Sequence, residues 1–94
     1  MGVYVNLPNE TKEEFLSREG MEVPKANWEN IPKDSIPVIL VDNGTFTSAP
    51  ICYSKEEYFE FIDSIDDPRP KKIFIVKKAR LKEIGCDFPG IDDK

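Results

Sequence analysis

Apolar residues recur at helical spacing in two segments of the chain, and both segments open with the same type of cap. In the first, Thr11 stands three residues before a Glu, which is a capping box and predicts a short helix over 12–19 that ends at Gly20. In the second, Ser54 stands three residues before Glu57 and predicts another helix. Its apolar residues fall at i, i+3, i+4 and i+7 and form one stripe: Tyr58, Phe61, Ile62 and Ile65.

A second pattern, a short unbroken apolar run of the kind found in buried strands, occurs as V-I-L-V and again as I-F-I-V. Asn43-Gly44 follows the first run and is a strong hairpin signal, so we predict a hairpin of 38–42 with 45–49 around a type I′ turn. In this register Pro37 lies opposite Pro50, at a level where neither proline has to donate a hydrogen bond to the other strand. The missing N–H groups limit extension of the sheet at that level.

The remaining segments carry shorter patterns. Prolines at 24 and 32 and the lack of any sustained period predict a long loop between the first helix and the hairpin, and loops of this length are usually functional or mobile. The other assignments are an edge strand or an extended arm over 3–5, the loop over 21–35, a buried strand over 73–77, a short helix over 78–84 and an irregular tail over 86–94.

These elements predict a small α+β protein with a single domain over 1–94. We expect a mainly antiparallel sheet of three to four strands, built from the hairpin 38–42/45–49 and the strand 73–77. Two or three short helices would cover one face of this sheet. The apolar character of 73–77 on both faces favours a central position for that strand.

Charge is distributed unevenly along the chain. The net charge of −5 divides into −9 over 1–68, with five Lys/Arg against fourteen Asp/Glu, and +4 over 69–94, with eight against four. A largely acidic body repels nucleic acid at long range, so we do not expect direct nucleic-acid binding. A protein partner fits the charge better.

Candidate chemistry is sparse. The chain has no His, which removes the side chain most often used as a general base and as a nitrogen ligand for zinc. Cys52 and Cys86 are expected to be packed, idle thiols in a reducing compartment. The acidic cluster Asp63, Asp66 and Asp67 lacks the alternating ligands of an EF-hand. We therefore expect no enzyme activity, no metal and no cofactor.

Two segments remain as candidate binding sites. Trp28 in the long loop, together with Asp63, Asp66 and Asp67, is the candidate partner-binding surface, and packing of Trp28 against the body is the alternative reading. The second candidate is an anion-binding segment in which prolines stiffen a run of cations, and a solvated rim around the strand is its alternative. Its residues are Arg69, Lys71 and Lys72.

No apolar run exceeds four residues, and the N-terminus has no charged and apolar regions of a signal peptide. We expect a cytoplasmic protein with no membrane partner.

The motif P-V-I-L-V-D-N-G-T-F-T, followed by a helix and then by D-D-P-R-P-K-K-I-F-I-V, resembles small uncharacterised proteins encoded by bacteriophages and prophages. The resemblance covers about residues 36–80 and implies no site residue. It implies a context, the host cytoplasm, in which small acidic phage proteins bind host proteins, including enzymes of host defence.

Three functions follow from these observations. The leading one is a non-enzymatic protein-interaction module, such as a phage accessory or anti-defence protein, that binds a host protein through an acidic surface. The first alternative is an oligomeric binder that sequesters an anionic, nucleotide-like ligand. The second is a structural phage component that self-assembles.

Overall fold

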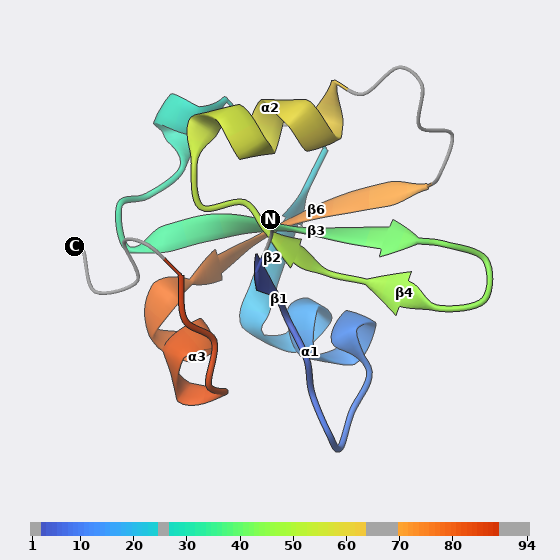
Figure 1. Cartoon of the computed structure of the whole chain (residues 1–94). Helices are drawn as coiled ribbons and strands as arrows, with labels where there is room; N and C mark the ends of the chain where they lie inside the picture. The colour runs from blue at the N-terminus through green and yellow to red at the C-terminus, as the bar shows by residue number, and fades with distance from the viewer. Residues whose placement is uncertain (1–2, 25–26, 64–69, 89–94) are drawn as a thin grey trace.

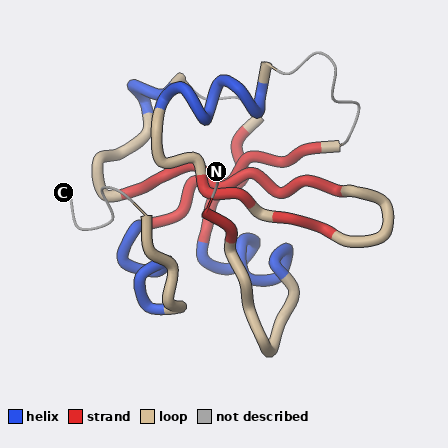
Figure 2. The backbone as a smooth tube through the Cα atoms, in the orientation of Figure 1, coloured by secondary structure: helices blue, strands red, loops and turns tan. Residues whose placement is uncertain are grey.

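The computed structural model of the chain describes residues 3–24, 27–63 and 70–88. Over these residues the protein is an α+β fold with a mainly antiparallel sheet (Figures 1 and 2), which confirms the predicted class. The sheet has six strands rather than three or four. In chain order the elements are β1 (Val3–Tyr4), α1 (Lys12–Glu19), β2 (Gly20–Val23), the 3-10 turn η1 (Trp28–Asn30), β3 (Ser35–Asp42), β4 (Thr47–Ser48), β5 (Pro50–Ile51), α2 (Lys55–Ile62), β6 (Lys71–Lys77) and α3 (Lys78–Glu83).

The strand order is β1-β5-β3-β6-β2, and β4 pairs with β3 beside β5. The longest ladder joins β3 to β6 and runs from Ser35 opposite Lys77 to Val41 opposite Lys71. β6 therefore lies inside the sheet, between β3 and β2, as its apolar character on both faces predicts. β1 is an edge strand, also as predicted.

Successive residues of β3 point to opposite faces of the sheet, and both faces bury apolar side chains. Val38 joins a core cluster with residues of α1 and α3, whereas Ile39 joins a second cluster with Tyr58 of α2. Helices accordingly cover both faces, with α2 on one side and α1 and α3 on the other (Figure 1). The expectation of helices on one face was wrong because β3 and β6 are apolar on both sides and need a cover on each.

The helix caps form as the sequence predicts. The Thr11 hydroxyl accepts a hydrogen bond from the Glu14 backbone at 3.1 Å and begins α1, which has the predicted bounds. The Ser54 hydroxyl accepts from the Glu57 backbone at 3.2 Å and begins α2. Ile65, expected on the apolar stripe of this helix, lies outside the described residues.

The hairpin forms, but its register differs by two residues from the predicted one. Asp42 pairs with Thr47, and the Asn43 N–H donates to the Phe46 carbonyl at 2.9 Å, so the two-residue loop is Gly44 and Thr45. Gly44 has a φ of 93°, and no other residue type among those described has a positive φ. A type I′ turn needs positive φ at both central positions, whereas glycine alone suffices at the first position of a type II′ turn.

The register shift separates Pro37 from Pro50. Pro37 instead lies across from Cys52, whose N–H donates to the Pro37 carbonyl at 3.0 Å. The N and C=O of a residue in an antiparallel strand point toward the same neighbour, so the missing N–H of Pro37 faces β5. Its pairing with Ile75 of β6 is unaffected, and Pro50 pairs with Tyr4 of β1. The predicted limit on sheet extension at these prolines was therefore wrong.

The expected long loop over 21–35 was also wrong in part. Its first residues belong to β2, which pairs with β6 from Gly20 opposite Val76 to Val23 opposite Ile73. The strand was missed because it is only four residues long and carries a charged residue in its middle. In the expected tail, residues 86–88 have no helix or strand, and 89–94 lie outside the described residues.

Gly20 joins α1 directly to β2, and the close approach of neighbouring atoms requires a residue without Cβ. A Cβ at this position would lie 2.9 Å from Cγ2 of Val76 and 3.0 Å from the Leu16 carbonyl oxygen. The Gly20 N–H also donates to that carbonyl, so the backbone has little freedom to move away.

We expect Gly20→Ala to lower the free energy of unfolding by about 1–3 kcal/mol, because the added methyl overpacks this junction. Without the clash, the lower chain entropy of Ala would favour the folded state. Urea denaturation measures the change, with Ser17→Ala on the exposed side of α1 as the control. Equal or higher stability of Gly20→Ala would contradict the packing at this junction.

Candidate functional site

The face of the sheet under α2, which we call the α2 face, is only partly covered by the described residues. Five strands side by side span about 19 Å at a spacing of about 4.8 Å, whereas a helix with its side chains is about 10–12 Å wide. α2 and η1 pack over the middle of this face, on the cluster that contains Ile39 and Ile73. The margin formed by β2 and β6 extends beyond that cluster.

Met21 and Ile75 occupy this margin. They are partners in the β2–β6 ladder and share a face with Val23 and Ile73, which belong to or pack on the cluster under α2. Ile75 is half-buried, and 66% of Met21 is exposed, the largest exposure of any large apolar residue in the described chain. Most of the Met21 side chain therefore has no neighbour within the described protein.

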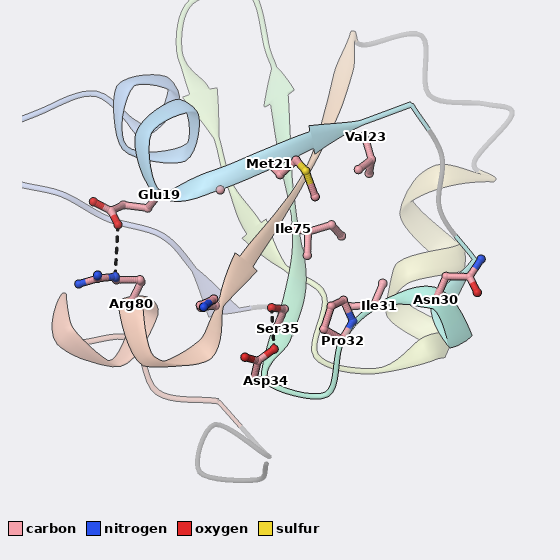
Figure 3. Close-up of a pocket in the computed structure, with 12 residues that line it drawn as sticks. Glu19, Met21, Val23, Asn30, Ile31, Pro32, Asp34, Ser35, Ile75 and Arg80 are labelled. Carbon is pink, nitrogen blue, oxygen red and sulfur yellow. Dashed lines mark hydrogen bonds and ion pairs between the residues drawn. The ribbon is translucent and has the colours of Figure 1, made fainter.

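A groove lies beside Met21, and we call it the β2 groove (Figure 3). Its cavity volume is about 790 Å³. The apolar side chains of Met21, Val23 and Ile75 lie on one side of it, and Ile31 and Pro32 face them from the segment that leads into β3 (Figure 3). The remaining lining residues are Glu19, Gly20, Asn30, Asp34, Ser35, Lys77 and Arg80.

One end of the groove carries an ion pair between α1 and α3, which continues into further ion pairs within each segment. Arg80 contacts Glu19 at 3.4 Å and Glu83 at 3.1 Å. Glu19 also accepts a hydrogen bond from Arg18 at 2.8 Å, and Arg18 holds Glu10 through two further bonds of 2.7 and 2.8 Å. These bonds lower the pKa of the Glu10 carboxyl and raise the pKa of the Arg18 guanidinium.

Trp28, predicted as a partner contact, is half-buried and packs on α2. Its ring centroid lies 6.0 Å from that of Tyr58 at an interplanar angle of 50°, and the side chain joins the cluster on the α2 face. This is the packing reading that the sequence left open. Asp63 is exposed at the C-terminal end of α2, and Asp66 and Asp67 lie outside the described residues.

The predicted anion site is not assembled among the described residues. Lys71 and Lys72 are consecutive in β6, so their side chains leave opposite faces of the sheet. Lys72 forms an ion pair with Glu13 of α1 at 3.3 Å. Arg69 lies outside the described residues.

The thiols lie in surroundings that disfavour nucleophilic chemistry. Burial raises the pKa of Cys52 to about 12, and the nearby Glu57 carboxylate acts in the same direction. Burial also raises the pKa of Cys86. Over 3–24, 27–63 and 70–88, no three Cys, Asp or Glu side chains are grouped to hold a metal ion. The same residues include no helix with the length and apolarity to span a membrane.

A second hollow lies beside the hairpin loop, with a volume of about 520 Å³. Its two exposed aromatic residues are Tyr4 and Phe46, and most of its other lining residues are polar. It is smaller than the β2 groove and offers less apolar surface for a ligand.

Sequence reasoning missed the β2 groove because three separate segments, 19–23, 30–35 and 75–80, form it. The available signal was the alternation of Met21 and Val23 around a charged residue, which is a strand pattern too short to separate from a loop. The segment 21–35, expected to be functional or mobile, lines the groove on two sides, and a function for it stays a prediction.

Comparisons of the sequence with models of protein families and with curated proteins, and of the fold with solved structures, gave no match.

The ion pairs beside the groove predict an acid-sensitive contribution to stability. Because Arg18 lowers the pKa of Glu10 in the fold, the contribution is present above the ordinary value of 4.5 and is lost as the pH falls through the lowered pKa. Urea midpoints between pH 6 and pH 3 should therefore fall less steeply in Arg18→Gln than in the wild type. Lys12→Gln, which removes one charge from the same helix, serves as the control, and identical slopes for all three proteins would refute the contribution.

Proposed function

We propose that this protein is a non-enzymatic protein-interaction module that holds apolar side chains of a partner protein in the β2 groove. The observation that carries the proposal is the exposure of Met21 at 66% beside a cavity of about 790 Å³. Met21 is a large, flexible apolar side chain exposed next to a groove. A partner that removes such a side chain from water lowers the free energy of the system.

The composition of the groove supports a protein partner. Methionine is enriched at protein interfaces, where its unbranched, polarizable side chain adapts to different contacts. The apolar center formed by Met21, Ile75 and Ile31 is bordered by charged residues such as Glu19 and Arg80. An apolar center with a polar rim is the usual arrangement of a protein-binding surface.

The remaining chemistry also favours binding over catalysis. A thiol with a pKa near 12, as at Cys52, is protonated at neutral pH and is a poor nucleophile. The groove itself contains no Cys, and the chain contains no His. Its charged side chains at Glu19 and Arg80 already pair with each other.

A host protein as the partner is the context that the resemblance to small bacteriophage proteins implies, and it stays a prediction. Contacts through Trp28 and Asp63 are compatible with a protein partner. Trp28 packs on α2 and Asp63 stands at the C-terminal end of α2, the helix that covers the middle of the same face. The two lysines at the start of β6 leave opposite faces of the sheet, and this arrangement gives less support to sequestration of an anionic ligand.

A peptide library selected on the purified protein tests the proposal. We expect the selected peptides to carry large apolar residues, and we expect Met21→Asp to weaken their binding by about tenfold or more, because a carboxylate replaces the apolar contact. Met21 is exposed, so the variant should fold with an unchanged circular dichroism spectrum.

Phe46→Asp is the matched control, because Phe46 is 63% exposed and lies in the second hollow rather than in the groove. Its affinity for the same peptides should equal that of the wild type. Failure to select any peptide, or loss of binding in Phe46→Asp but not in Met21→Asp, would overturn the proposed function.

A further inference from the structure

Lys77 adds a charge to the β2 groove that no described residue neutralises. It stands two positions after Ile75 in β6, so both side chains leave the α2 face, and both line the groove. Lys77 is exposed and forms no ion pair within 3–24, 27–63 and 70–88.

The other charges of the groove already have partners. Glu19 contacts both Arg18 and Arg80, so its carboxylate is neutralised within the protein. The Asp34 carboxylate accepts a hydrogen bond from the Ser35 hydroxyl at 3.2 Å, and Figure 3 shows it directed away from Met21 and Ile75. On the sheet face that carries Met21 and Ile75, Lys77 is therefore the charged lining residue without an ion pair among the described residues.

The edge of the sheet at β2 is poorly suited to pairing with a strand of a partner, which favours contacts through side chains. β2 is an edge strand, but it has four residues, an exposed Glu22 in its middle and Pro24 directly after it. Short length, charge and proline are the features that protect a sheet edge from pairing with another chain. A partner would accordingly lie on the apolar face of the groove.

We propose that the occupant of the β2 groove is a peptide segment of a partner protein in which an acidic residue lies close to a large apolar residue. The apolar side chain packs on Met21 and Ile75, and the carboxylate forms an ion pair with Lys77. Two residues of a strand span about 6.6 Å, so the acidic residue stands two positions from the apolar one in an extended segment or three to four in a helical one. This inference rests on the proposed function and adds the chemistry of the partner.

Short acetylated peptides with Leu or Phe two to four positions from a Glu provide the probe, and a matched set carries Gln in place of Glu. Binding to the full chain is measured by fluorescence anisotropy at low and high salt. We expect the Glu peptides to bind about two- to fivefold more tightly than the Gln peptides at low salt, and Lys77→Glu to remove this preference. Lys12→Glu makes the same charge change on α1 and should leave the preference intact.

The outcomes separate the inference from the function on which it rests. Equal binding of Glu and Gln peptides, with loss of both in Met21→Asp, would overturn the acidic preference and leave the interaction module intact. No binding of either set to any protein variant would overturn both.

Two further outcomes identify other occupants and also overturn the inference. Binding of decanoate that depends on Lys77, without binding of the peptides, would identify a small anionic amphiphile. Concentration-dependent dimerisation that Met21→Asp abolishes, measured by light scattering, would identify a second copy of this chain.

Discussion

The pairing of β3 with β6 is the interaction on which the rest of the structure depends. The two strands form the longest ladder of the sheet, and their neighbouring pairs point to opposite faces, as with Val38–Phe74 and Ile39–Ile73. Burial of each of these side chains stabilises the folded state by about 1.5–3 kcal/mol, so exposure of either face to water would be unfavourable. Within the described residues, three short helices cover these two faces.

The β2 groove arises because the helices are distributed unequally between the two faces of the sheet. Two helices, α1 and α3, share one face, and the ion pair of Arg80 with Glu19 joins them beside the sheet. On the opposite face α2 and η1 pack over the middle strands, which leaves the margin at β2 and β6 with Met21 exposed. The groove thus arises from the architecture, and its apolar residues continue the same side of the sheet that α2 buries. The proposed partner would cover apolar surface that the described residues leave exposed.

The sequence predicts those features whose signals are local. The caps at Thr11 and Ser54 depend on residues three positions apart, and the apolar run of β6 carries its own evidence for a central strand. The hairpin register was mispredicted because Asn43-Gly44 and Gly44-Thr45 can each form a two-residue loop. Gly44 has a positive φ in both, and the absence of a positive φ at Asn43 distinguishes the observed turn from the predicted type I′ turn. The groove could not be predicted, because its lining residues carry no local sequence signal. Pairing of β2 with β6 places Met21 beside Ile75, and the segment before β3 adds Ile31. Trp28, the most conspicuous residue of its segment, packs on Tyr58 beside the groove.

Methyl NMR in the presence of a neutral, soluble nitroxide tests most directly the claim that one margin of the α2 face is open. The nitroxide broadens the signals of methyl groups that it can approach and leaves buried ones unchanged. The structure predicts strong broadening of the Met21 methyl and intermediate broadening of the Ile75 methyls, with none for Ile39, which is fully buried on the same face. Protection of Met21 and Ile75 equal to that of Ile39 would contradict the account, because it would show that the chain already covers this face.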